Sequence, residues 1–172
     1  MWSDLILLAP AAVVFVVLFF LWPRKNTAGT SPAEEGPPVN AIVVDGSNVM
    51  YWGGEPSLKI LSRVLQNVKD AGYAPIVFFD ANVGYIVEDR YLNEAQLAPL
   101  IDSWSDRICV VSKGVVADES ILMFASDHGL RIVTNDQYRD WRMQFPHAAK
   151  RGILVKGKWV SGNVKWARPL RA

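Results

Sequence analysis

The sequence predicts an α/β fold: a three-layer sandwich with a mostly parallel central sheet, preceded by one transmembrane helix. From residue 41 onward, short apolar runs alternate with stretches of helical periodicity. Such alternation is typical of parallel strands joined by helical crossovers, with helices on both faces of the sheet. The uncharged run at 5–22 (LILLAPAAVVFVVLFFLW) predicts the helix that comes before the sandwich.

Residues 5–22 have the length and composition of a membrane-spanning segment. A helix of this length rises about 27 Å, close to the roughly 30 Å of a hydrocarbon core. Trp2 and Trp22 flank the run, at positions where indole rings favour the interface. A cleaved signal peptide needs a basic start, whereas Arg24 and Lys25 follow this run. The positive-inside rule then predicts a single-pass membrane protein, in contact with membrane lipid, whose C-terminal domain lies in the cytoplasm.

Composition divides the chain after the transmembrane segment (1–22) into three parts. Residues 23–40 contain four prolines and no apolar periodicity, which predicts a linker. Residues 41–146 have the alternating pattern of one domain, and residues 147–172 are expected to form a basic hairpin or tail. Residues 141–172 hold eight bases and no acid, although the net charge of the chain is only +1. This asymmetry indicates an anionic partner, either nucleic acid or lipid headgroups.

Four short runs are expected to form the strands of the parallel sheet. They are almost fully apolar, as strands covered on both faces must be. The runs are 41–44 (AIVV), 75–79 (PIVFF), 107–111 (RICVV) and 131–134 (RIVT). The run 153–160 (ILVKGKWV) differs, because Lys156-Gly157 interrupts it, and it predicts a hairpin or an edge strand.

Helical periodicity fills the gaps between these runs. Residues 57–71 place their leucines and valines on one stripe, with Ser57 as the expected N-cap. A weaker helix is expected at 93–101, and a third at 118–128. A short helix is expected to begin near Asp136.

The informative feature is that acids follow the predicted strands. Five aspartates lie at or just beyond the strand ends: Asp45, Asp80, Asp118, Asp136 and Asp140. The carboxyl ends of parallel strands share one edge of the sheet, which is where such sheets bind ligands. The sequence therefore predicts that carboxylates from distant segments meet at this edge, with Asp136 and Asp140 on one helical face.

Clustered carboxylates repel each other unless a cation or a proton offsets the charge. Two of them 4 Å apart repel by roughly 4 kcal/mol at an effective dielectric near 20. Oxygen-only ligands favour Mg²⁺ or Mn²⁺ over zinc. Taken singly, Asp80 or Asp118 also fits a helix cap or a turn. One cysteine, Cys109, and two histidines exclude a disulfide framework and a standard zinc site, and a glycine-rich phosphate loop is absent.

Three segments resemble the NYN domain, a PIN-like ribonuclease fold, in the subgroup known from Regnase-type endoribonucleases with CCCH zinc fingers. They are 43–49 (VVDGSNV), 117–125 (ADESILMFA) and 133–141 (VTNDQYRDW). The resemblance implies Mg²⁺-dependent cleavage of single-stranded or stem-loop RNA. It also implies four metal-binding acids and one amide that orients a ligand or the substrate: Asp45, Asp118, Asp136 and Asp140, with Asn48.

The sequence departs from that family in two respects. Animal members have adjacent acids where this chain has Ala117-Asp118, which leaves one ligand either missing or supplied by Glu119 or Asp80. The chain also lacks the cysteines of a CCCH finger, so RNA must be held elsewhere. Cations interleaved with tryptophans in residues 141–172 are the candidate for RNA binding.

We therefore expect a membrane-anchored, metal-dependent endoribonuclease. The alternative is a catalytically inactive NYN module that serves as a membrane-tethered RNA-binding or scaffolding domain, which the Ala117 departure favours. The oligomeric state is left open by the sequence.

Overall fold

The computed structural model of the protein describes residues 36–172. The predicted transmembrane helix and residues 23–35 of the predicted linker lie outside this range. Among the described residues, no helix combines the length and the apolar character needed to cross a bilayer. Residues 36–172 form one compact unit.

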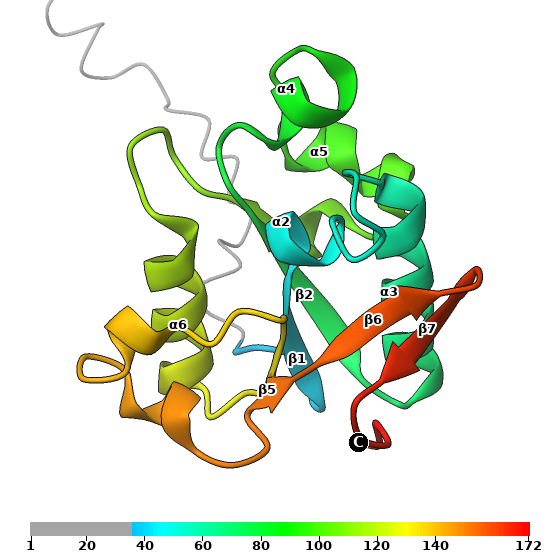
Figure 1. Ribbon diagram of the computed structural model, residues 1–172. Coiled ribbons are helices and arrows are strands. Elements are labelled where there is room, and N and C mark those ends of the chain that lie inside the picture. The colour runs from blue at the N-terminus through cyan, green and yellow to red at the C-terminus, as the bar shows by residue number, and fades with distance from the viewer. Residues whose placement is uncertain (1–35) are drawn as a thin grey trace, which may run out of the picture. The chain divides into compact units, whose positions relative to one another are not determined.

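Five strands form the central sheet (Figure 1). They are β1 (Ala41–Asp45), β2 (Ala74–Phe79), β3 (Ile108–Val110), β4 (Ile132–Val133) and β5 (Leu154–Val155). The strand order is β3-β2-β1-β4-β5, and every neighbouring pair is parallel. Strands β1 to β4 agree with the four predicted runs to within one residue at each end. The predicted parallel α/β sheet is therefore confirmed.

Helices cover both faces of this sheet and produce three layers (Figure 1). One face carries α3 (Leu58–Asp70), α5 (Glu94–Leu97) and the 3₁₀ turn η1 (Ala98–Ile101), and the other carries α6 (Ala117–Asp127). Ser57 caps α3, since its hydroxyl accepts a hydrogen bond from the Ile60 amide. Asp118 lies inside α6 and does not cap it, because the N-cap position is Val116.

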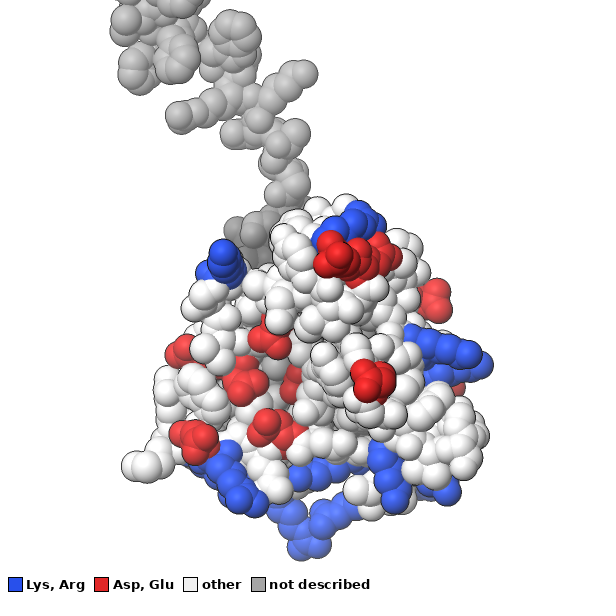
Figure 2. Space-filling model, turned by 45° about the horizontal axis from the view of Figure 1, so that its top comes forward, with Lys and Arg blue, Asp and Glu red and all other residues white. Residues whose placement is uncertain are grey.

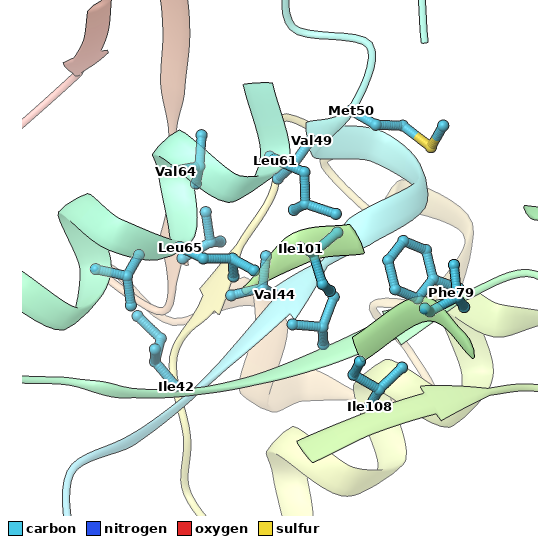
Figure 3. Packing of buried hydrophobic residues seen from close by; sticks show 14 of the residues in the cluster. Ile42, Val44, Val49, Met50, Leu61, Val64, Leu65, Phe79, Ile101 and Ile108 are labelled. Carbon is cyan, nitrogen blue, oxygen red and sulfur yellow. The ribbon is translucent and has the colours of Figure 1, made fainter. Parts of the chain in front are cut away.

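The period of two along β1 divides the core between the two layers. Ile42 and Val44 point toward α3, where Figure 3 shows them beneath Leu61 and Leu65. Val43, between them, belongs to the cluster under α6. All these side chains are fully buried, and each contributes about 1.5–3 kcal/mol through its burial. The two cores hold the carboxyl ends of β1 and β4 in fixed positions.

Several short elements were not predicted because they have too few residues to show a period. They are α2 (Gly46–Val49), α4 (Val83–Glu88), η2 (Ser105–Arg107), η3 (Arg139–Trp141) and η4 (Pro146–Ala149). The helix predicted to begin near Asp136 is wrong in position. Tyr138 adopts a left-handed conformation, with φ of 45°, and helical structure begins only after it, in η3. Asp136 lies in the preceding loop, so it does not share a helical face with Asp140.

The C-terminal region contains both an edge strand and a hairpin. Strand β5 pairs with β4 at the edge of the main sheet, so the sheet continues beyond residue 146. Strands β6 (Gly157–Val160) and β7 (Asn163–Trp166) form a separate antiparallel pair. The hairpin turn lies at Ser161-Gly162, not at Lys156-Gly157, because both turn residues have the positive φ that tight hairpin turns require.

Candidate functional site

The carboxyl ends of β1 and β4 lie side by side where the strand order of the sheet reverses. Open parallel sheets bind their ligands at this point. Asp45 is the last residue of β1 and Thr134 follows β4 directly. A hydrogen bond of 2.9 Å from Thr134 Oγ1 to Asp45 Oδ2 joins the two. Gly46 allows the chain to pack tightly on β2, since a Cβ there would lie 2.9 Å from the Phe78 carbonyl oxygen.

Asp45 is the central acid of this edge. It is only 4% exposed, and both of its carboxylate oxygens accept hydrogen bonds. Oδ1 accepts a hydrogen bond of 3.0 Å from the Asn48 amide. Oδ2 accepts one from Thr134 Oγ1 and another, of 3.1 Å, from the Tyr138 hydroxyl. These three donors fix the position of the carboxylate and stabilise its charged form.

Burial nevertheless raises the pKa of Asp45 from 3.8 to about 6. The three hydrogen bonds act in the opposite direction, and the charge of Asp118 adds to the increase. A buried carboxylate with a strongly raised pKa at a ligand-binding edge is typical of functional sites. A cation placed beside it would favour the ionised form.

Asp118 interacts electrostatically with acids from three other segments of the chain. The pKa of Asp118 is raised, first by burial and then by the charges of Asp136 and Asp80, while the nearby Trp141 side chain lowers it. The charge of Asp118 in turn raises the pKa of Asp45. Asp118 therefore interacts electrostatically with the other three acids. Figure 2 shows acidic side chains gathered on the face at the carboxyl edge of the sheet. That Asp45, Asp80, Asp118 and Asp136 together hold one ion stays a prediction.

The loop after β4 contributes Tyr138 to the site. Its backbone amide donates to Asp136 Oδ1, and the Asp136 amide donates to Thr134 Oγ1, so the loop is closed by local hydrogen bonds. Tyr138 is 2% exposed, and its ring packs in the core under α6. Burial and the neighbouring charge of Asp45 raise the pKa of Tyr138 strongly. The Tyr138 hydroxyl therefore remains a hydrogen-bond donor at physiological pH.

The side chain of Asn48 makes two hydrogen bonds within the protein through its oxygen. Its Oδ1 accepts hydrogen bonds from Trp52 Nε1 at 3.1 Å and from the Asn135 amide at 3.0 Å. The side-chain oxygen therefore ties α2 to the loop after β4. That Asn48 orients a ligand or the substrate stays a prediction. The Nδ2 group is the part of the side chain that is left for this role.

Asp140 and Glu119 are not drawn into this network. Asp140 is exposed in η3, and Glu119 is half-buried beside Asp118 in α6. No hydrogen bond between side chains of residues 36–172 involves either one. Their part in the site stays a prediction.

The donor set fits a hard divalent cation in its chemistry but does not form a closed cage. Within the described part of the chain, no three His, Cys, Asp or Glu side chains are placed to hold one ion together. Mg²⁺ commonly keeps several waters and binds through one or two carboxylates. The four acids offer only oxygen ligands and repel each other, so they suit such water-rich binding.

The family of the chain follows from its sequence. Residues 38–163 match the family model described as the Zc3h12a-like ribonuclease NYN domain. The chain belongs to this family. Membership confirms the NYN part of the resemblance and places the chain in a family of RNA-cleaving nucleases. The Regnase subgroup and the membrane anchor stay predictions.

Two solved structures resemble this NYN chain. The crystal structure of nuclear proteinaceous RNase P 2 from A. thaliana has a TM-score of 0.58 and 23% identity, and the match covers 76% of this chain and 30% of that one. A second structure, of Arabidopsis thaliana nuclear protein-only RNase P 2, has a TM-score of 0.60 and 21% identity, with 98% and 35% covered. The NYN chain thus spans about a third of those chains, and the likeness shows the fold. No curated protein sequence matches it significantly.

Thr134 and Tyr138 were missed as site residues by sequence reasoning, and Trp141 was expected to bind RNA but not to contact Asp118. Thr134 is a polar residue at the end of an otherwise apolar run, and Tyr138 and Trp141 lie within the segment that carries the family resemblance. Those were the available signals. Tyr138 itself adopts a left-handed conformation, which no periodicity indicates.

Proposed function

We propose that this protein is a metal-dependent endoribonuclease whose active site is the carboxyl edge around Asp45. The observation that supports this most strongly is the buried Asp45 carboxylate, held by Thr134 and Tyr138 at the reversal point of the sheet. Asp118, influenced by Asp136 and Asp80, supplies further negative charge. Membership in an RNA-cleaving family makes RNA the substrate.

A divalent cation, Mg²⁺ or Mn²⁺, would be held by one or two of these acids and by waters, through Asp118 with Asp136 or Asp80, beside the buried Asp45 carboxylate. When bound, such an ion lowers the pKa of a coordinated water and offsets the charge of a phosphate. Asp45 would keep a fixed orientation toward it, because three hydrogen-bond donors hold the carboxylate in place.

We propose in-line attack of water on the phosphodiester, which leaves 5′-phosphate and 3′-hydroxyl ends. The alternative, attack by the 2′-hydroxyl of the RNA, commonly uses histidines as acid and base. Both histidines of the chain are engaged elsewhere: His147 contacts the Leu130 carbonyl at 2.8 Å, and His128 packs against Phe124. Leu130 precedes β4, at the edge of the sheet opposite to Asp45.

The test is cleavage of a circular single-stranded RNA by the full chain. Because a circle has no ends, only an endonuclease converts it to a linear strand. We expect linear product in Mg²⁺, none in EDTA, and a 5′ end that carries a phosphate removable by phosphatase. A cyclic 2′,3′-phosphate on the product would contradict the proposed attack of water.

The second candidate is an inactive NYN module that binds RNA or a protein partner. Two observations favour it: residues 36–172 contain no ready-made group of three metal ligands, and Ala117 stands where an acid is expected. In the same assay this candidate retains the circular RNA without cleaving it, and EDTA has no effect on retention.

We also propose that residues 5–22 anchor the domain to a membrane and leave it on the cytoplasmic side. The support is the length and uncharged character of that segment. The full chain should stay with the membrane pellet after alkaline carbonate extraction, while a variant without residues 1–22 should be released. Release of the full chain by carbonate would contradict the anchor.

A further inference from the structure

A basic surface runs along β5 and the β6–β7 hairpin, from Lys156 at the carboxyl edge of the sheet to Arg131 and Arg151, which precede β4 and β5 toward its other edge. It consists of two adjoining hollows of about 280 and 360 Å³ that share Lys156 and Ala167 in their walls. The walls contain six bases and no acid: Arg131, Arg151, Lys156, Lys158, Lys165 and Arg168. Figure 2 shows basic side chains along the border of the face that carries the acids.

The positive charge of this surface is not neutralised by the protein. Among residues 36–172, the ion pair that the structure shows joins Arg90 to Glu88, and neither residue lines either hollow. Lys158 and Lys165 are direct cross-strand partners in the hairpin, and both are exposed. Like charges directly opposite each other destabilise a strand pair. An anion that binds between or over the two lysines would offset this repulsion.

The hairpin is held firmly by its other face. Trp159 and Val164 are partners there, as are Gly157 and Trp166. Trp166 packs edge-on against Trp52, with ring centroids 5.9 Å apart. A side chain at Gly157 would collide with Trp52, at 2.5 Å from its ring. Since successive residues of a strand point to opposite faces, this docking turns the lysines outward.

Hydrogen bonds connect the hairpin to the catalytic acid. Asn135 Nδ2 donates to the Gly157 carbonyl at 2.8 Å, and the Gly157 amide donates back to Asn135 Oδ1 at 3.3 Å. The Asn135 amide donates to Asn48 Oδ1, and the Asn48 amide donates to Asp45. Lys156, directly after β5, lies at the same carboxyl edge as Asp45, because β5 is parallel to the other strands. The basic surface therefore has a fixed position relative to the site.

We propose that these two hollows bind the phosphate backbone of the RNA strand next to the bond that is cleaved. This inference rests on the proposed function and names the surface that holds its substrate. Six cations that have no acidic partner and line two adjoining hollows suit a chain of phosphates. The fixed link from Gly157 to Asp45 then sets which phosphodiester reaches the acids.

The test substitutes one lysine of the cross-strand pair. Lys158→Glu places a carboxylate opposite Lys165, which replaces a repulsive pair by an attractive one, so the variant should melt no lower than wild type. The control is Lys59→Glu, which makes the same change of charge at an exposed position of α3. Binding of a short fluorescein-labelled uridine homopolymer is measured by anisotropy, with the full chain in non-ionic detergent and EDTA, across a salt series.

We expect Lys158→Glu to weaken RNA binding about tenfold and to reduce the slope of log K against log salt by roughly 1.4, the value for two lost contacts to a single strand. Lys59→Glu should change neither. In Mg²⁺, Lys158→Glu should raise KM about tenfold and leave kcat within about twofold. Equal losses in both variants, or no loss in Lys158→Glu, would overturn the inference.

Two further outcomes separate this inference from its alternatives. If Lys158→Glu leaves RNA binding unchanged but weakens sedimentation with phosphatidylserine vesicles relative to phosphatidylcholine vesicles, the surface binds lipid and the inference is overturned. If wild type binds RNA through Lys158 but does not cleave it in Mg²⁺, the inference holds and the nuclease proposal fails. If wild type and Lys158→Glu cleave RNA equally well in Mg²⁺, the nuclease proposal holds and this inference fails.

Discussion

Asp45→Asn should cleave RNA at least ~100-fold more slowly than wild type, since even second-layer partners of a metal site commonly contribute 10–100-fold. The substitution keeps the shape of the side chain and removes its charge. The Asn48 amide would still find an oxygen acceptor, and the hydroxyls of Thr134 and Tyr138 would accept from the new amide group. The fold should therefore remain intact while the reaction is lost.

The same variant should be at least as stable as wild type at neutral pH in EDTA. The pKa of Asp45 is about 6 in the folded protein and 3.8 as its ordinary value, so the folded state holds the proton more tightly than the unfolded chain. The free energy of unfolding of wild type therefore falls as pH rises from about 4 to above 6, by about 3 kcal/mol in total from this group. Asp45→Asn removes that decrease.

Urea unfolding at pH 5 and pH 8 measures this difference. The matched control is Asp106→Asn, which removes one negative charge from the exposed turn η2 and should preserve both the cleavage rate and the pH dependence. If Asp45→Asn unfolds in less urea than wild type at pH 8, the raised pKa of Asp45 is not what governs its stability there.

Asp118→Asn should lose both RNA cleavage, by at least ~100-fold, and the stabilisation that Mg²⁺ confers. The charge of Asp118 interacts with the charges of Asp80, Asp136 and Asp45. At a Mg²⁺ concentration about ten times its Kd, binding to the folded state adds about 1.4 kcal/mol to the free energy of unfolding of wild type. Asp118→Asn should show little of this gain. In EDTA it should be no less stable than wild type, because one repulsive charge is removed.

Glu119→Gln is the matched control for Asp118, since it removes the neighbouring charge from the same turn of α6 at similar exposure. It should keep the gain from Mg²⁺ and cleave within about threefold of wild type. Loss of cleavage in Glu119→Gln, with Asp118→Asn active, would move the metal ligand to Glu119. Thermal melting with and without Mg²⁺ distinguishes the two cases.

Much of the fold was predictable because its determinants are local. Ser57 and the apolar stripe behind it predict α3, and the fully apolar AIVV predicts a central strand. The elements that were not predicted depend on contacts between distant segments. The short helix α2 is one of them. Its N-cap is Asp45, whose side chain accepts a hydrogen bond from the Asn48 amide, and its Gly46 packs closely against β2. Elements of three to six residues are too short for a periodicity that would indicate them.

The site was predictable in its acids but not in the groups that hold them. Asp45 and Asp118 could be placed at one edge because parallel strands bring their ends together. The donors from Thr134 and Tyr138 to Asp45 span about half of the chain, and no local pattern encodes them. Asp140 was expected beside Asp136 from helical spacing, and the left-handed Tyr138 between them removes that spacing.

The most direct measurement compares wild type and Asp45→Asn on circular RNA, with Mg²⁺ and with EDTA. Wild type in Mg²⁺ should open the circle to a linear strand with a 5′-phosphate, and the other three combinations should leave it closed. Opening by Asp45→Asn at the rate of wild type, or by wild type equally fast in EDTA, would contradict a metal-dependent site built around this buried carboxylate.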